Sequence, residues 1–221
     1  MNPDAKRPDL PRCVILGGGG HARVLIDCLR LCDLVEIEGV LDSDSSLHGQ
    51  KVLDVPVLGG DELLGGMAAG GVTHFVVGLG GVGDNGPRRR LFELGCSWRL
   101  TPLTVRHPSA TVSRWASVEP GCQLLPGVIV NACAFLGKNV IVNSGAIVEH
   151  DCAVGDHAHI ATGARLASTV QVGTGAHIGA GATVRQSIRI GEDAIVGAGA
   201  VVVKDVGPGV VVAGVPARPI R

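Results

Sequence analysis

The segment Glu149-His150-Asp151 carries side chains that could act as a proton-transfer site. An imidazole beside a carboxylate is the arrangement by which enzymes fix a histidine tautomer and raise the basicity of the ring. Such a pair can take a proton from an attacking amine or hydroxyl. A surface histidine beside two acids is more often a solvated turn, so from the residues alone both interpretations stay open.

A glycine-rich loop near the N-terminus offers a second kind of chemistry, the binding of a phosphate. The apolar run CVIL passes at Gly17 into four glycines, and the pattern Gly17-x-Gly19-x-x-Ala22 is followed twenty residues later by Asp42. This spacing fits the dinucleotide fingerprint, in which glycines let a phosphate approach a helix N-terminus and the acid meets a ribose hydroxyl. The alternative is a tight turn that binds no ligand.

Composition and charge weaken the case for several other classes of protein. The seven cysteines include no C-x-x-C pair, which argues against a disulfide framework or a zinc ribbon. A net charge of −1 gives no overall field that would gather nucleic acid or an anionic membrane. The dense basic run Arg88-Arg89-Arg90 is either the solvated start of a helix or an anion contact. With no apolar stretch of membrane-spanning length and no signal sequence at the N-terminus, we expect a reducing cytoplasmic location.

The elements around the glycine loop read as a small α/β unit. Apolar runs predict strands, and spaced apolar residues predict helices that pack on them. Three strands are predicted: one that begins at Cys13, one over Val35–Leu41 and one over His74–Gly78. Two helices are predicted, over His21–Leu31 and Pro87–Leu94. A complete NAD domain needs about six strands, and there is room for about four. We therefore expect a truncated unit that binds part of a nucleotide rather than a redox cofactor.

The second half of the chain is organised by a six-residue repeat. Every sixth residue from Val112 to Val202 is Val, Ile or Leu, and a second apolar position, often Ala or Cys, stands two residues before each anchor. The sixteen anchors are Val112, Val118, Leu124, Val130, Leu136, Val142, Val148, Val154, Ile160, Leu166, Val172, Ile178, Val184, Ile190, Val196 and Val202. Period six cannot form a helical stripe but suits short strands joined by turns, which is the pattern of a β-helix.

This architecture accounts for the unusual composition. The chain has 46% hydrophobic residues but only 2% aromatic ones, and 34 of its 221 residues are glycine. Stacked coils can build such a core from small aliphatic side chains, because their backbones lie close together. We expect the glycines that follow many anchors, such as Gly155 and Gly173, to supply positive φ at the corners. The division expected is an α/β domain over residues 1–106 and a β-helix domain with a C-terminal tail over residues 107–221.

The order of these motifs resembles one bacterial family, the nucleotide-sugar acetyltransferases named for the sialic acid O-acetyltransferase, of the NeuD/PglD type. The motifs are VILGGGGHA, HPSA, IVEHDC within an unbroken hexapeptide array, and AGVPARPIR at the end, so the resemblance covers nearly the whole chain. It implies a mainly β fold, a left-handed parallel β-helix preceded by a small Rossmann-like domain. N-acetylating members act on UDP-4-amino-4,6-dideoxy sugars or on GDP-perosamine.

The resemblance also implies roles for individual residues. The catalytic residues that match the family pattern are His150 as general base, Asp151 as the acid that orients it, and Asn143. The residues that match acetyl-CoA contacts are His159 and the backbone at Ala180 and Ala198. The residues that match the sugar-nucleotide site are Gly19, Gly20, His21, Asp42 and Ser43. One departure lies near Gly81, where LGGVGDNG is longer and richer in glycine than the PglD type.

The implied reaction is acetyl transfer from acetyl-CoA to a sugar amine, without a metal and without a covalent enzyme intermediate. His150 would take a proton as the amine attacks the thioester carbonyl, in the synthesis of a bacterial surface glycan such as O-antigen. In this family the site lies between neighbouring β-helices of a homotrimer. The expected partners are therefore a nucleotide-linked amino sugar, acetyl-CoA and two further copies of the chain.

Three alternatives stay open beside this prediction. Sialic acid O-acetylation is the closest, since it needs the same fold and the same base. A zinc lyase of the γ-carbonic anhydrase type would use three histidines with a close H-x4-H pair, and the histidines at positions 150, 157, 159 and 177 lack that spacing. A non-catalytic protein would use the β-helix as a scaffold and the glycine loop as a nucleotide sensor.

Overall fold

The computed structural model describes residues 10–220, which form two compact units. One unit, called here the nucleotide-binding-like unit, contains the described residues up to Gly80 together with Arg90–Leu103. The other, the β-helix unit, contains Gly81–Arg89 and the chain from Thr104 onward. The division expected at residue 106 differs from this one, because the segment Gly81–Arg89 groups with the β-helix unit.

The nucleotide-binding-like unit is built on a mainly parallel sheet in the order β3-β4-β2-β1-β5-β6. Its four longer strands are β1 (Arg12–Leu16), β2 (Glu36–Leu41), β4 (Val55–Gly59) and β5 (His74–Val77). The two-residue edge strands are β3 (Lys51–Val52), which is antiparallel to β4, and β6 (Thr101–Pro102). The α-helices are α1 (Gly20–Cys32) and α2 (Leu64–Ala69), and the 3₁₀ turns are η1 (Ser45–Leu47) and η2 (Asp61–Leu63). Helix α3 (Gly86–Ser97) begins in the segment that groups with the β-helix unit and continues into this one.

The three strands and two helices predicted for this unit are confirmed, with boundaries shifted by a few residues. Helix α1 buries one apolar stripe against the sheet, which includes Leu25, Ile26 and Leu29. The sequence analysis missed β4 and α2. A proline stands inside VPVLG of β4, and two glycines stand inside LGGMAA of α2, so neither segment has a strong propensity for its element.

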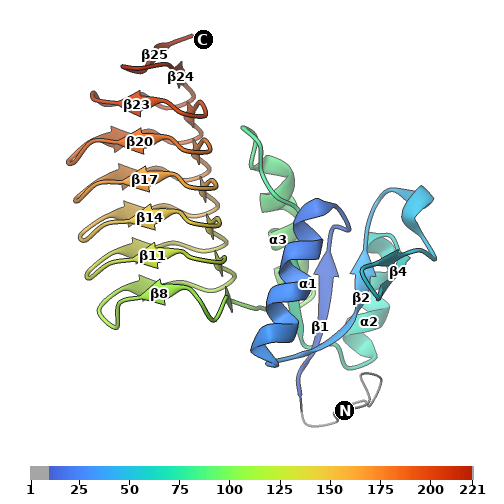
Figure 1. The fold of residues 1–221 in the computed structure, drawn as a ribbon. Helices are drawn as coiled ribbons and strands as arrows, with labels where there is room; N and C mark the ends of the chain where they lie inside the picture. The colour runs from blue at the N-terminus through green and yellow to red at the C-terminus, as the bar shows by residue number, and fades with distance from the viewer. Residues whose placement is uncertain (1–9, 221) are drawn as a thin grey trace. The chain divides into compact units, whose positions relative to one another are not determined.

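The β-helix unit winds through three faces, each a mainly parallel sheet of two- or three-residue strands (Figure 1). The first face contains β7 (Val105–Arg106), β10 (Gln123–Leu124), β13 (Ile141–Val142), β16 (His159–Ile160), β19 (His177–Ile178), β22 (Ile195–Val196) and β24 (Val211–Ala213), with antiparallel β25 (Arg218–Pro219) at its end. The second contains β8 (Thr111–Val112), β11 (Ile129–Val130), β14 (Ile147–Val148), β17 (Arg165–Leu166), β20 (Thr183–Val184) and β23 (Val201–Val202). The third contains β9 (Ser117–Val118), β12 (Phe135–Leu136), β15 (Ala153–Val154), β18 (Gln171–Val172) and β21 (Arg189–Ile190).

Pairing between coils joins residues eighteen apart, as three hexapeptides per coil require. Ile160 pairs with Ile178, and Val172 pairs with Ile190. Each of the sixteen anchors is the second residue of its strand, and fourteen of them are buried. The other two, Val112 and Val118, lie near the start of the array and are partly buried against the same core. The fold is a left-handed parallel β-helix, and the predicted repeat register is confirmed.

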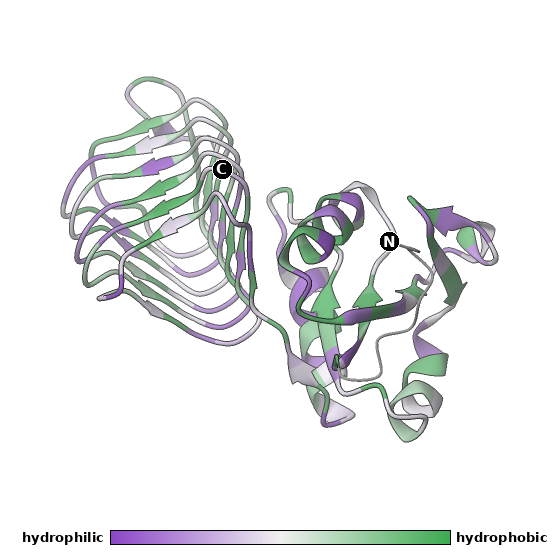
Figure 2. Ribbon diagram, turned by 60° about the horizontal axis from the view of Figure 1, so that its bottom comes forward, coloured by the Kyte–Doolittle hydropathy of each residue, from purple (hydrophilic) through white to green (hydrophobic). Residues whose placement is uncertain are grey.

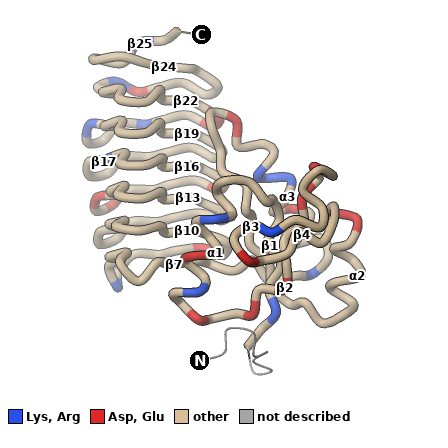
Figure 3. Tube along the Cα trace, turned by 45° about the vertical axis from the view of Figure 1, so that its right-hand side comes forward, with Lys and Arg blue, Asp and Glu red and all other residues tan. Residues whose placement is uncertain are grey.

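The three turns of each coil define three edges, which are named here for use below. The first edge joins the first and second faces, the second edge joins the second and third, and the third edge joins the third back to the first. In Figure 2, hydrophobic segments recur from coil to coil and stack into columns along the β-helix. In Figure 3, basic and acidic residues are scattered over both units, and neither sign forms a continuous field.

The expected role of the glycines after the anchors is wrong. Positive φ occurs two positions later, at residues such as Asp151 (φ 59°) and Gly163 (φ 66°). The glycines after the anchors are required instead by the close approach of the next coil. A Cβ atom at Gly155 would lie 2.6 Å from the Thr174 nitrogen, and one at Gly173 would lie 2.5 Å from the Glu192 nitrogen. Backbone packing between coils therefore excludes a side chain there.

The register generates a stability prediction. Ile178 is fully buried, so Ile178→Asn removes apolar contacts and buries an unpaired amide, and we expect a loss of at least about 3 kcal/mol of unfolding free energy. Thr174→Asn is the matched control, because Thr174 is half-buried in a turn. Asn is preferred to Asp there because Asp156 and Glu192 hold the equivalent positions in the adjacent coils. Chemical denaturation measures both, and equal losses would contradict the register.

Candidate active site

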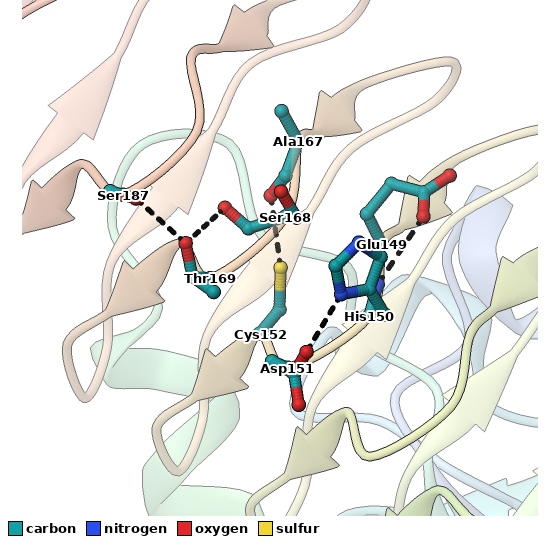
Figure 4. A network of polar contacts seen from close by, with 8 residues as sticks. All are labelled: Glu149, His150, Asp151, Cys152, Ala167, Ser168, Thr169 and Ser187. Carbon is teal, nitrogen blue, oxygen red and sulfur yellow. Dashed lines mark hydrogen bonds and ion pairs between the residues drawn. The ribbon is translucent and has the colours of Figure 1, made fainter.

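His150 and Asp151 lie together at the second edge, in the turn between β14 and β15. The Nδ1 atom of His150 is 2.7 Å from Oδ2 of Asp151, and both side chains are about half exposed, at 55%. The backbone N–H of His150 donates to a carboxylate oxygen of Glu149 (Figure 4). Asp151 can take its position because its backbone adopts left-handed φ, which turns the carboxylate back toward the ring.

This geometry gives His150 the arrangement of a general base. A carboxylate accepts the Nδ1–H of a neutral imidazole, which leaves the lone pair on Nε2. No described residue is hydrogen-bonded to that Nε2 atom. The turn itself is held in place by the next coil, since the His150 carbonyl oxygen accepts a hydrogen bond from Thr169. The ring is therefore oriented at one nitrogen and available to a substrate at the other.

Asn143 and His159 lie at a different place, beside the first edge. The Nδ2 atom of Asn143 is 3.2 Å from Nε2 of His159, and Oδ1 of Asn143 accepts a hydrogen bond from the Ser144 backbone. Ala180 and Ala198 lie on this same edge in the two following coils, one above the other. Both residues are exposed, and their backbone N–H groups donate to no described residue. The first edge therefore offers a row of hydrogen-bond donors.

The residues predicted for acetyl transfer thus form two groups within one chain. His150 and Asp151 are brought together at the second edge, whereas Asn143 and His159 are brought together at the first. Asn143 precedes strand β14 and His150 follows it, so one side of the triangular coil lies between the two groups. The sequence analysis named the residues of both groups but did not predict that they lie on different edges of the same chain.

The glycine loop has the close backbone packing that its pattern predicts. Gly17 has φ +101°, and a Cβ atom there would lie 3.1 Å from the Leu79 nitrogen. Gly19 and Gly20 are exposed at the start of α1, and their N–H groups donate to no described residue. A Cβ atom at either would meet no atom within 4 Å, so the space beside the helix N-terminus is open. His21 is half-buried in the first turn of the same helix.

Asp42 holds the glycine loop from the end of β2. One carboxylate oxygen accepts a 2.6 Å hydrogen bond from the Gly18 N–H, and the other accepts one from Asp44. Asp42 and Ser43 line a cavity of about 100 Å³ together with Gly17, Leu41, Asp61, Leu79 and Leu91. The carboxylate that the fingerprint assigns to a ribose hydroxyl therefore also positions the loop that would hold the phosphate.

Asp61 is a candidate that the sequence analysis missed. It lines the same cavity from η2, and it is close enough to Asp42 for the two charges to interact. Burial raises the pKa of the Asp61 carboxyl, and the negative charge of Asp42 raises it further. No sequence motif identifies Asp61, because the segment around Gly59-Gly60-Asp61 matches no known spacing of site residues. Two acids at one small cavity suit the recognition of hydroxyl groups.

The remaining candidate groups are inert or structural. Burial raises the pKa of the Cys122 thiol to about 12 and also raises the pKa of Cys152, so both thiols stay protonated inside the coils. Among residues 10–220, no cluster of three or more His, Cys, Asp or Glu residues could hold a metal ion. Within the same range no helix is long and apolar enough to span a membrane.

Arg88, the first residue of the basic run, has neither of the two roles expected from the sequence. Arg88 is only 1% exposed and packs inside the β-helix unit, where its Nε atom lies 3.5 Å from the Asn139 carbonyl oxygen. Burial lowers the pKa of the guanidinium to about 9. Arg88 is therefore neither a solvated helix start nor an anion contact, whereas Arg89 and Arg90 are exposed.

Comparison with known proteins places these features in a family. A model of the PglD N-terminal domain matches residues 12–94. A histidine variant of perosamine N-acetyltransferase from Caulobacter crescentus, in complex with CoA and GDP-perosamine, is similar over 95% of this chain and 96% of its own, with 37% identity and a TM-score of 0.89. The acetyltransferase domain of PglB from Neisseria gonorrhoeae in complex with acetyl coenzyme A is 32% identical over 96% of this chain and 100% of its own, with a TM-score of 0.87. WeeI from Acinetobacter baumannii is 26% identical over 94% and 99%, with a TM-score of 0.80.

His177, which stacks edge-on against His159, generates a pH prediction. Burial lowers the pKa of His177 below its usual value, because the buried imidazolium is poorly solvated. An unfolded histidine titrates near pH 6.5, so protons favour the unfolded state. The stability that neutral His177 contributes is present above about pH 6.5 and is lost as the pH falls below it. We expect Tm to fall between pH 7.5 and 5.5, and His177→Gln to reduce that fall. Equal slopes in the wild type and in His177→Gln would contradict this account.

Proposed function

The chain belongs to the NeuD/PglD-type family of acetyltransferases, and on that premise we propose that it transfers the acetyl group of acetyl-CoA to the 4-amino group of a nucleotide-linked amino-deoxy sugar. The similarity to a perosamine N-acetyltransferase along nearly the full length of both chains supports N-acetylation of a nucleotide amino sugar. GDP-perosamine and UDP- or dTDP-4-amino-4,6-dideoxy sugars are the substrates that this class comprises.

The observation that carries the proposal is the hydrogen bond between His150 and Asp151. The free amine of the sugar attacks the carbonyl carbon of the thioester, and Nε2 of His150 takes the proton that the nitrogen loses. A new C–N bond forms, the C–S bond breaks, and the CoA thiolate leaves and receives a proton. Asp151 stabilises the imidazolium that exists between these two proton transfers. No covalent enzyme intermediate is needed.

Acetyl-CoA is proposed to lie along the first edge. The stacked N–H groups of Ala180 and Ala198 can donate to the amide carbonyls of an extended pantetheine arm. His159 and Asn143 lie at the end of that row, where the thioester would reach. A backbone or side-chain N–H at this end can stabilise the oxyanion that forms during attack.

The two-edge arrangement supports a homotrimer in which neighbouring copies share each site. Within one chain His150 lies a full side of the coil away from Asn143 and His159, so one copy alone does not bring the base to the proposed thioester site. Parallel β-helices packed side by side would bring the second edge of one copy to the first edge of the next. A cyclic assembly repeats that contact three times and closes.

The sugar nucleotide is proposed to bind at the glycine loop. Gly19 and Gly20 offer open N–H groups to a phosphate, and His21, Asp42 and Ser43 surround the same loop end. We assign this role to residues 1–106 and acetyl transfer to residues 107–221, with the Gly81–Arg89 segment as an exception. We further propose a cytoplasmic location and a role in making a bacterial surface glycan.

One experiment separates this proposal from its alternatives. The protein is incubated with acetyl-CoA and a panel of UDP-, GDP-, dTDP- and CMP-linked sugars, and the products are identified by mass spectrometry. We expect a gain of one acetyl group on an amino sugar. Acetylation of CMP-sialic acid or free sialic acid alone would establish O-acetylation instead, and no acetyl transfer to any sugar would favour the nucleotide-sensing scaffold.

The same assay tests the base. His150→Ala should lower kcat by at least about 100-fold, because general-base catalysis contributes about 10²–10⁴-fold. The substitution lies at an exposed turn, so the fold and the affinity for acetyl-CoA should be kept. Thr169→Ala is a control in the adjacent coil of the same edge, and its kcat should stay near wild type. An unchanged kcat in His150→Ala at saturating substrates would remove His150 from the mechanism.

A further inference from the structure

Three hydrogen bonds in the β-helix unit form a chain that has only one possible direction. At one end the Ser144 N–H donates to Oδ1 of Asn143 at 2.8 Å. In the middle Nδ2 of Asn143 lies 3.2 Å from Nε2 of His159. At the other end Nδ1 of His159 lies 2.7 Å from the carbonyl oxygen of Gly81, in a buried contact.

The two ends fix the direction because backbone groups cannot exchange roles. The Gly81 carbonyl can only accept, so the His159 proton must be on Nδ1. The Ser144 N–H can only donate, so the oxygen of the Asn143 amide must face it. The neutral Nε2 of His159 then accepts from Nδ2 of Asn143. Moving the His159 proton to Nε2 would set two donors against each other and leave the Gly81 carbonyl facing a bare lone pair.

Gly81 is held in place by the segment that the sequence analysis assigned to the other domain. Asn85 is 3% exposed, and its Nδ2 atom donates to the carbonyl oxygens of Gly175 and Ala176 at 2.9 and 3.3 Å. This fastens the Gly81–Arg89 segment to the coil above His159. A Cβ atom at Gly81 would lie 1.9 Å from Oδ1 of Asn85, so any residue other than glycine would require the Asn85 side chain or the backbone to move.

The side chain of His159 is buried, which disfavours a charge on its ring. The ring of His177 packs edge-on against the ring of His159, with 5.0 Å between their centroids. Both side chains are buried, and a proton on either ring would place a poorly solvated charge beside the other. No carboxylate takes part in the chain of hydrogen bonds.

From this geometry we propose that the Gly81 carbonyl is a positioning group that fixes the tautomer of His159 and, through it, makes Asn143 a hydrogen-bond donor at the first edge. Oδ1 of Asn143 is committed to Ser144, and one Nδ2 hydrogen to His159, so the remaining Nδ2 hydrogen is the group that the side chain offers to a ligand. The inference rests on the proposed acetyl-CoA site. It adds that the donor direction of the Asn143 amide is set jointly by Ser144 and, through His159, by the Gly81 carbonyl of a loop outside the hexapeptide array.

The test uses the full-length protein labelled with ¹⁵N-histidine. Long-range ¹H–¹⁵N spectra distinguish the two neutral tautomers and the imidazolium, and the His159→Gln variant identifies the signal. At pH 7.5 we expect His159 to be the neutral Nδ1–H form. The Nε2–H form or the imidazolium in the wild-type protein would overturn the proposal.

Gly81→Ala displaces the carbonyl by one added methyl group, and Val82→Ala is the matched control on the adjacent, 96% exposed side chain. We expect Gly81→Ala to mix the tautomers of His159 and to raise KM for acetyl-CoA about five- to twenty-fold, as expected from the loss of one oriented hydrogen bond. The Kd for the sugar nucleotide and the behaviour of Val82→Ala should stay at wild type. Should Gly81→Ala fail to fold, Asn85→Asp keeps the side-chain size and removes the two donated bonds, with the same expected effects.

The outcomes separate this inference from the proposed function. A changed tautomer with unchanged acetyl-CoA binding overturns the positioning role, and an unchanged tautomer in a folded Gly81→Ala protein overturns the role of the carbonyl. If the protein is not an acetyltransferase, the wild-type protein will fail to bind acetyl-CoA in calorimetry. In that case the tautomer spectrum, which needs no substrate, still reports on the chain of hydrogen bonds.

Discussion

The backbone hydrogen bonds between successive coils, whose paired residues lie eighteen apart, are the constraint on which the rest of the β-helix depends. Neighbouring coils are joined in both directions: Ala161 donates to Ile178 in the next coil, and in the turns Thr169 donates to His150 in the preceding coil. This repeat forces every sixth residue inward and leaves the turns to project. It also sets the coils so close together that glycine is required after many anchors. A side chain in a turn is therefore held by the backbone of its neighbours rather than by its own packing.

The same constraint explains how a rigid scaffold can carry a site without a deep pocket. Residues in equivalent turns stack into three straight edges, so ligands can be held along an edge by repeated backbone groups, as at Ala180 and Ala198. A base such as His150 is oriented by the next residue in its own turn. What one chain cannot do is bring two edges together. On this account catalysis depends on a second copy, and folding and assembly are therefore parts of the mechanism.

The sequence predicts those features that follow from local pattern. The anchors, the inward cysteines, the β1–α1 turn and the exposure of His150 all depend on periodicity or on residues next to each other, and the structure has them. Contacts between distant segments could not be predicted this way. Arg88 looks like a surface residue in a basic run but is buried, and Gly81 lies 78 residues from the histidine that it contacts. Asp61 is brought to its cavity by β4, the strand that precedes it, and β4 was not predicted because it contains a proline.

The central claim, that each active site combines the second edge of one copy with the first edge of another, can be tested by mixing two inactive proteins. His150→Ala removes the base, and Ala180→Trp blocks the proposed acetyl-CoA edge, so each variant alone should be inactive. Co-expression with separate affinity tags, followed by isolation of the mixed oligomers, lets intact halves meet. In a cyclic trimer each mixed oligomer has one intact pair of edges among its three sites, so about a third of the wild-type sites should be restored. Mixed oligomers that show no activity above the two single variants would contradict the shared site.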